Sequence, residues 1–388
     1  MHAYFSITTV ILYLVIGFLG YLCIQRMMKP APQRINMGDN VPLKFNSYWL
    51  FIFIYTFIAV FREVSPDIGG ADALVYKLNF ETILKEGFVE KYLGRELESG
   101  FTHFTYAIRS ITSSYKLYFL IVYAFISYSY ILFIKEKCPR GLIYIPFILL
   151  MCPFLRSFNT LRTSMAVGFI LIGISMLDKR KWLSLLFLIA AFFFHRISIL
   201  YIFIWPFYYL TKNRFANQTK WQFIIFAFAG MILAYFAAVA LQTFLGDSLL
   251  LDDRDMHFLM RKADEDHFGR YPLVIGHILL FTAVIWFYNK IRWDEKSIFL
   301  RDLFIYDLWV APAGVILGMW RFVEYLYIVR LSLWCVVLFG ISGKMKRADL
   351  NFAKFIYASL FIAWLIFRIF KEYDDAKISP YIFDFSLW

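Results

Sequence analysis

The chain consists largely of apolar stretches that are long enough and numerous enough to cross a lipid bilayer. An α-helix needs about 20 residues to cross the hydrocarbon core, and about twelve such stretches alternate with charged or Pro/Gly-containing breaks along the 388 residues. Hydrophobic residues make up 61% of the chain and charged residues 18%, whereas soluble domains are about 45–50% apolar and a quarter charged. The sequence therefore predicts an all-α polytopic membrane protein with about 12 (10–13) transmembrane helices.

The expected spans follow the apolar runs. Those near 141–155, 163–177 and 182–194 are short for a bilayer, so we expect them to tilt little, to break midway or to re-enter from one side. The other spans are expected near residues 4–24, 46–61, 117–134, 198–210, 221–245, 272–288, 303–319, 322–340 and 353–370. No internal repeat or low-complexity linker divides the chain, which predicts one domain over residues 1–388. The four cysteines have no CxxC spacing, so neither a disulfide framework nor a zinc site is expected.

Lys and Arg gather in alternate short loops, which hold 21 of the 40 basic residues but only 7 of the 28 acidic ones. Loops rich in Lys and Arg stay in the cytoplasm. The loops are residues 25–45, 135–141, 178–182, 211–220, 289–302 and 341–354. Both termini and the two long loops, 62–116 and 246–271, are therefore expected to face outward, and we expect loop 62–116 to carry short helices. Because the net charge of +12 reflects this bias and the anionic inner leaflet, no nucleic-acid partner is needed.

Polar residues that interrupt or border the apolar stretches fall near the outer interface in this topology. Charged groups at membrane depth are costly and usually face a cavity or a substrate path. These residues are Arg62, Asp67 and Asp72 after the second span, Arg156, Asn159 and Arg162 between two spans, His195 and Arg196 within FFFHRISIL, and Arg321, Glu324 and Arg330 near a span start. We therefore expect the functional site on the outer face.

Several arginines beside a few carboxylates indicate a site for a phosphate-bearing ligand. Guanidinium groups bind phosphate bidentately and stay ionised, and in the outer half of a bilayer they point to a lipid-linked phosphate or diphosphate. They can stabilise the charge on a diphosphate leaving group without a metal, while a carboxylate or His deprotonates an attacking hydroxyl. Aromatic residues of the outer loop such as Tyr76 suit sugar rings. The acidic stretches Asp252–His257 and Asp264–His267 match no metal motif, so we expect no metal or other cofactor.

Four short motifs resemble those of one family. The run FREVSPDIGGADALVYKLNF (Phe61–Phe80) resembles the opening motif of the EpsG/Wzy-type bacterial polysaccharide polymerases, a family that includes O-antigen polymerases. ELESGF (Glu96–Phe101), NTLRTSMA (Asn159–Ala166) and FFFHRIS (Phe192–Ser198) are similar to that family's later elements, in the same order. The resemblance covers roughly residues 45–210. Beyond it only hydropathy and WRFVEYLYIVR (Trp320–Arg330) match in a general way.

The resemblance implies a GT-C-like glycosyltransferase of the bacterial inner membrane with its site facing the periplasm. Such enzymes join undecaprenyl-diphosphate-linked oligosaccharide repeat units into a surface polysaccharide, alongside a flippase and a chain-length regulator. On this basis Arg62, Arg162 and Arg321, with Arg156 nearby, would hold diphosphate. Asp72, Glu98 or His195 would serve as the acid or base. The Arg62-to-Asp72 spacing is longer than usual, which keeps Asp67 as an alternative acid. We expect Tyr76, Arg196 and Glu324 to bind substrate.

Other interpretations of the same residues stay open. Arg62 and Arg321 also suit interfacial anchors, Asp72 suits a helix cap before Ala73, and His195 suits a helix-to-helix hydrogen bond. Glu98 also suits a solvated loop.

Two other functions are also compatible with the sequence. A related glycan ligase uses the same chemistry, and a transporter or flippase of lipid-linked sugars has a similar hydropathy. A transporter favours ionisable residues at mid-membrane and repeated halves. Membrane-bound acyl transfer is less consistent with the sequence, because His195 lies on the side away from cytosolic acyl donors. The concentration of polar residues at one interface favours an enzyme.

Overall fold

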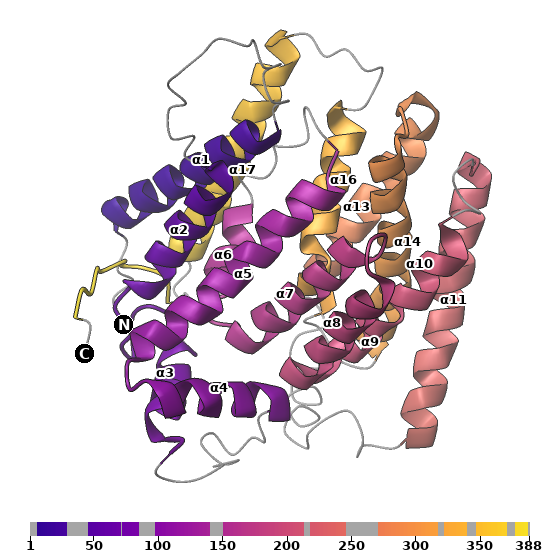
Figure 1. Cartoon of the computed structure of the whole chain (residues 1–388). Helices are drawn as coiled ribbons and strands as arrows, with labels where there is room; N and C mark the ends of the chain where they lie inside the picture. The colour runs from indigo at the N-terminus through magenta and orange to yellow at the C-terminus, as the bar shows by residue number, and fades with distance from the viewer. Residues whose placement is uncertain are drawn as a thin grey trace, which may run out of the picture. The chain divides into compact units, whose positions relative to one another are not determined.

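The chain folds as an assembly of helices (Figure 1). The computed structural model describes residues 6–28, 46–70, 72–84, 98–139, 150–212, 218–245, 271–316, 322–339, 347–370 and 377–386. Within these ranges the regular elements are helices, and the only β-type pairings are isolated bridges. Three helices are long and apolar enough to cross a membrane, α1 (Ile7–Met28), α5 (Tyr115–Lys137) and α11 (Lys220–Leu245). The prediction of an all-helical membrane protein is therefore confirmed in its coarse form.

Shorter apolar helices occupy several of the other expected spans. They are α2 (Ser47–Val60), α7 (Leu161–Met176), α8 (Lys181–Phe194) and α16 (Tyr327–Phe339). The remaining long helices are α13 (Tyr271–Phe287), α14 (Glu295–Ile316) and α17 (Arg347–Phe370), and the expected span at 141–155 falls mostly outside the described residues, which there include α6 (Met151–Arg156). The total of twelve crossings stays a prediction.

The expected span at 198–210 is broken rather than continuous. It begins with the 3-10 turn η2 (Arg196–Ser198) and continues as α9 (Ile199–Ile202) and α10 (Ile204–Thr211). Pro206 lies in the first turn of α10. Because proline has no backbone N–H to donate to the carbonyl four residues earlier, a continuous helix would lose a hydrogen bond there. The break therefore falls where a continuous helix would lose this hydrogen bond.

Helix α11 presents large apolar side chains outward. Trp221, Ile225, Leu233 and Phe236 are each between 64% and 70% exposed. An apolar face of this size in water would be an aggregation hazard, whereas in a bilayer it contacts lipid. The exposure pattern agrees with a membrane-embedded chain.

The chain contacts define two compact units. Unit 1 comprises Met1–Val89, Thr102–Gly168 and Lys346–Trp388, and unit 2 comprises Glu90–Phe101 and Phe169–Met345. The single domain expected from the sequence stays a prediction.

Unit 1 is built around α2, which packs against both α1 and α5. Glycines allow close helix packing, as small residues do in membrane bundles. A Cβ on Gly20 of α1 would lie 2.8 Å from the ring of Tyr55 in α2, and one on Gly168 of α7 would lie 2.7 Å from the ring of Phe125 in α5. Two shorter helices, α3 (Ala73–Thr82) and α4 (Ser99–Ile111), lie between α2 and α5 in the sequence.

One end of unit 1 gathers segments that are far apart in the sequence. The hydroxyl of Tyr13, in α1, donates to the carbonyl of Ile378 at 2.7 Å. The hydroxyl of Tyr381 donates to the carbonyl of Ile58, near the end of α2, at 2.8 Å. The beginning of α1, the end of α2 and residues 377–386, here named the C-terminal segment, therefore lie at the same end of the unit. The topology predicted from the sequence places both termini and the end of the second span on the outer side, so it requires these segments to lie at one end.

Unit 2 is built around α14. Trp309 of α14 packs against Gly230 of α11 and donates its indole N–H to the carbonyl of Phe226 at 3.3 Å. Helix α16 packs against both α13 and α14. The short helix α15 (Phe322–Tyr325) contacts η2.

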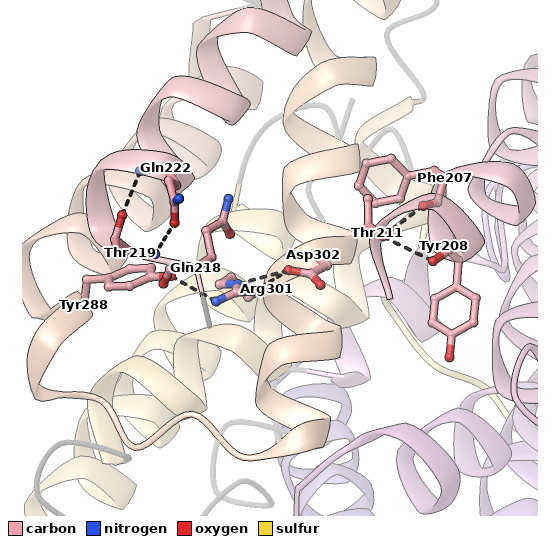
Figure 2. A network of polar contacts seen from close by, with 9 residues as sticks. All are labelled: Phe207, Tyr208, Thr211, Gln218, Thr219, Gln222, Tyr288, Arg301 and Asp302. Carbon is pink, nitrogen blue, oxygen red and sulfur yellow. Dashed lines mark hydrogen bonds and ion pairs between the residues drawn. The ribbon is translucent and has the colours of Figure 1, made fainter. Parts of the chain in front are cut away.

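A buried polar cluster fixes one end of α14 (Figure 2). Arg301 is 1% exposed and donates to Oδ1 of Asp302 from Nε at 3.0 Å and from Nη2 at 2.8 Å. Its Nη1 donates to the hydroxyl of Tyr288 at 2.9 Å, and that hydroxyl donates to the carbonyl of Gln218 at 2.8 Å. Because these bonds join α14 to the 3-10 turn η4 (Tyr288–Lys290) and to the residues before α11, they serve to hold the fold together.

Candidate functional site

The loop between α2 and α3 carries three of the six predicted site residues of unit 1, Arg62, Asp67 and Asp72. It turns through two glycines with positive φ, Gly69 at +88° and Gly70 at +117°. A Cβ on Gly70 would also lie 2.5 Å from the carbonyl oxygen of Phe158, which follows α6. Glycine is needed at Gly70 for both reasons, because other residues rarely adopt this backbone conformation and the neighbouring backbone leaves no room. The loop therefore lies directly against the segment between α6 and α7.

Arg62 is fully engaged inside this loop. Its side chain is 1% exposed, and its Nε donates to the carbonyl of Gly69 at 2.6 Å. Its Nη1 donates to the carbonyl of Ala59, and its Nη2 donates to the hydroxyl of Tyr123 at 2.9 Å. The guanidinium carbon also lies 4.1 Å from the ring centre of Phe158. These contacts describe a residue that holds the loop in shape, and the diphosphate-binding role expected for Arg62 stays a prediction.

Asp72 joins the loop to the arginine-bearing segment. Its backbone N–H donates to Oδ1 of Asn159 at 2.7 Å. Asp72 precedes α3, but its side chain makes no capping hydrogen bond to that helix. The half-buried carboxylate is thus available for other chemistry. Asp67, the alternative acid, is 87% exposed and lies 3.7 Å from Nζ of Lys377.

The other predicted residues of unit 1 lie around the same junction. Arg156 ends α6 and Arg162 lies in the first turn of α7, and both are half-buried. Asn159 lies between them in the sequence and is bonded to Asp72. Tyr76, in α3, is 6% exposed. The structure therefore brings the Phe61–Phe80 and Asn159–Ala166 motifs together.

A second group of predicted residues lies in unit 2, where α8 ends. His195 is 6% exposed, and its Nδ1 lies 2.6 Å from the hydroxyl of Tyr325 in α15. The ring of Tyr325 stacks on that of Tyr201 with centres 4.5 Å apart. Arg196, in η2, and Glu324, in α15, are half-buried residues of two elements in contact. The interpretation of His195 as a residue that bonds between helices agrees with its contact to Tyr325.

Glu98 also lies near the end of α8. It precedes the first turn of α4, and a Cβ on Gly100 would lie 2.7 Å from the carbonyl oxygen of Phe193 near the end of α8. The Glu96–Phe101 and Phe192–Ser198 motifs therefore also meet, within unit 2. Arg321 lies outside the described residues, as do the acidic stretches Asp252–His257 and Asp264–His267.

Sequence reasoning missed a buried ionic cluster in unit 2. Asp307 of α14 is 0% exposed, and its Oδ2 lies 2.5 Å from Nη1 of Arg330 in α16 and 3.0 Å from Nε2 of His277 in α13. Arg330 is 8% and His277 2% exposed. The cluster joins three helices and neutralises a carboxylate that would be costly to bury alone. Both Asp307 and His277 interrupt apolar runs, which is the signal that identified His195.

The arrangement suits charge stabilisation and proton transfer. Unit 1 offers the half-buried acidic residue Asp72, whose backbone N–H is bonded to Asn159 in a segment with two arginines. Unit 2 offers the buried imidazole of His195, with the half-buried residues Arg196 and Glu324 in two elements that are in contact. Within the part of the chain that the structure describes, no group of three or more His, Cys, Asp or Glu side chains is arranged to hold a metal ion.

Comparison with known proteins identifies the family. A family model described as the EpsG family matches residues 47–383, which is most of the chain. No curated protein and no solved structure gives a significant match. The family is associated with glycosyltransferase-like polymerases, in agreement with the motifs that meet in each unit. The chain belongs to the EpsG family, a membership that suggests a polysaccharide polymerase-like membrane protein.

Proposed function

We propose that the protein is a membrane glycosyltransferase that joins undecaprenyl-diphosphate-linked oligosaccharide repeat units into a surface polysaccharide such as O-antigen. The observation that carries this proposal is the hydrogen bond between Asp72 and Asn159, which brings an uncapped carboxylate to a segment with Arg156 and Arg162. A base beside phosphate-binding groups is what transfer from a lipid diphosphate needs. Membership of the EpsG family supports the same reaction class.

In the proposed reaction, a hydroxyl of the acceptor saccharide attacks the anomeric carbon of the donor. The new glycosidic C–O bond forms while the bond from that carbon to the diphosphate oxygen breaks, and the lipid diphosphate leaves with the electron pair. Asp72 takes the hydroxyl proton. Arg156 and Arg162 stabilise the charge that grows on the diphosphate, because fixed cations in a dry site act strongly on developing charge.

The remaining predicted residues keep proposed roles. Arg62 and Arg321 are proposed to support diphosphate binding, and Tyr76, Arg196 and Glu324 to bind saccharide. Glu98 and His195 are the alternative bases. We further propose a GT-C-like arrangement in the bacterial inner membrane, with the site facing the periplasm and with a flippase and a chain-length regulator as partners. The excess of Lys and Arg in alternate loops supports this orientation.

Elongation in detergent tests the proposal. The purified chain is given lipid-diphosphate-linked repeat units, and products are separated by length. A polymerase yields a ladder of longer lipid-linked chains, and Arg162→Ala removes the ladder while the exposed Arg180→Ala keeps it. Transport has no meaning without a closed membrane, so a wild-type protein that leaves the repeat units unchanged contradicts polymerisation and favours a transporter or a flippase.

A further inference from the structure

The C-terminal segment, residues 377–386, is bonded to both sides of the loop that carries Arg62 and Asp72. On one side, the N–H of Glu63 donates to the carbonyl of Ile382 at 2.8 Å, and the N–H of Asp384 donates to the carbonyl of Phe61 at 2.9 Å. On the other side, the N–H groups of Gly69 and Gly70 both donate to the carbonyl of Lys377, at 2.9 and 3.2 Å. The loop belongs to no helix, so its backbone groups need partners other than those of a helix, and the C-terminal segment supplies part of them.

A charged contact fastens this segment to α5. Nζ of Lys116 lies 2.8 Å from Oδ2 of Asp384, and the Lys116 side chain is only 2% exposed. The same ammonium donates to the backbone carbonyl of Asp384, and the hydroxyl of Tyr115 donates to Oδ2 at 3.1 Å. Burial raises the pKa of Asp384, but the hydrogen bonds from Lys116, Ser386 and Tyr115 outweigh it and hold that pKa below its usual range.

A weaker contact lies at the rim of the same segment. Nζ of Lys377 lies 3.7 Å from Oδ1 of Asp67, and the two side chains are 36% and 87% exposed. Exposed pairs of this kind stabilise little. Of the two ion pairs, the Lys116–Asp384 pair is the more buried and the better hydrogen-bonded, so it contributes more to holding the segment in place.

We infer that the C-terminal segment is a strap that sets the conformation of the Arg62–Asp72 loop, with Lys116 and Asp384 as its positioning residues. The inference rests on the proposed function, because it assigns the strap to the placement of Asp72 for transfer. Neither Lys116 nor Asp384 touches substrate in this scheme. Loss of their contact lets the loop move, and a displaced base slows the chemical step more than it weakens substrate binding.

Two readouts test the strap, and one of them does not depend on activity. All four native cysteines are buried, so a maleimide reports on an introduced cysteine. Val64 lies in the loop and is 6% exposed, and Val64→Cys places a thiol there with little change in volume. The rate of labelling is measured in Val64→Cys alone, and in Val64→Cys combined with Asp384→Asn or with Asp384→Glu. Asp178→Asn is the matched control, because Asp178 lies 2.7 Å from Lys212 in an exposed pair of unit 2.

The strap predicts that Asp384→Asn raises the labelling rate roughly tenfold, in line with the loss of one charge-assisted hydrogen bond. It also predicts that Asp384→Asn lowers kcat for elongation by a similar factor with KM nearly unchanged, and that Asp384→Glu recovers most of both. The double variant with Lys116→Met and Asp384→Asn is expected to label no faster, and to have a kcat no lower, than the more damaging of the two single variants. The reason is that both substitutions remove the same contact. Asp178→Asn changes neither readout.

The possible failures are distinct. Equal labelling and equal kcat in Asp384→Asn and wild type overturn the strap while the polymerase stands. Additive losses in the double variant also overturn it, because they assign the two residues to separate roles. Faster labelling in Asp384→Asn together with a wild-type protein that elongates nothing supports the strap as a feature of the fold and overturns the proposed function.

Discussion

The backbone N–H of Asp72 donates a 2.7 Å hydrogen bond to the side-chain oxygen of Asn159, which is 87 residues away in the sequence. This bond uses the backbone of Asp72 and leaves its carboxylate without a capping role. It also places the beginning of α3 beside the segment that connects α6 and α7. A residue held by its backbone while its acidic group stays available is what a positioned base requires.

Asp72→Asn is expected to lower kcat for elongation by roughly 10² to 10⁴, the range that general acid–base catalysis contributes. The amide keeps the shape and the backbone bond to Asn159 but cannot take a proton. Asp67→Asn is expected to keep near-wild-type activity, because Asp67 is 87% exposed. Steady-state elongation rates of the two variants decide between the carboxylates, and the reverse outcome assigns the base to Asp67.

Arg62→Lys is expected to destabilise the protein by about 3 kcal/mol. A lysine has one ammonium group and cannot reach the carbonyls of Ala59 and Gly69 and the hydroxyl of Tyr123 together. Thermal unfolding of the purified protein in detergent measures the loss, with the exposed Arg180→Lys as control. An unchanged Tm with a weaker Kd for the lipid-linked donor would instead support direct diphosphate binding by Arg62.

Asp307→Asn is expected to destabilise the protein by about 3–5 kcal/mol, because it leaves the buried Arg330 without its counter-charge. Asp307→Asn combined with Arg330→Met is expected to cost less than Asp307→Asn alone, since no uncompensated charge then stays buried. Thermal unfolding of both variants provides the comparison. If the double variant is the less stable of the two, the cluster does not act through charge balance.

The ion pair between Lys116 and Asp384, which holds the C-terminal segment, is expected to be lost only at acidic pH. A carboxyl whose pKa is lower in the folded than in the unfolded state stabilises the fold above the unfolded value, about 3.9 for Asp, and loses that contribution as the pH falls through the folded value. The pKa of Asp384 is lowered in this way by Lys116 and Tyr115. Hydrogen exchange of residues 61–70, corrected for the intrinsic rate, should therefore be constant between pH 5 and 8 and rise below about pH 4. In Asp384→Asn the corrected exchange rate should be fast over the whole pH range. An Asp384-dependent change in the exchange rate near neutral pH would contradict the stabilising role given to the Asp384 carboxylate.

The helical segments could be predicted from the sequence because burial in lipid leaves a strong local signal. Apolar runs marked α1, α5 and α11 to within a few residues. The break before α10 was not specified in advance, although Pro206 was visible, because a proline in a membrane helix can also be accommodated as a kink. The number of crossings depends on such breaks and on neighbours that the sequence does not reveal.

The sequence could suggest candidate site residues but not how they are arranged. Arg62 has the same sequence context whether it anchors to lipid headgroups, binds diphosphate or holds a loop, and nothing in that context indicates its three hydrogen bonds. The C-terminal segment gave no signal, because it meets the loop through backbone groups that every residue carries. Asp307 and His277 did carry a signal, since each is a single polar residue within an apolar run.

The release of lipid diphosphate during synthesis tests the proposed reaction most directly. The purified protein in detergent is supplied with lipid-diphosphate-linked repeat units, and the free lipid diphosphate is counted against the glycosidic bonds in the product. Polymerisation predicts one lipid diphosphate released for each bond formed, with both quantities falling together in Asp72→Asn. A wild-type protein that forms no bond and releases no lipid diphosphate would contradict the assignment as a polymerase.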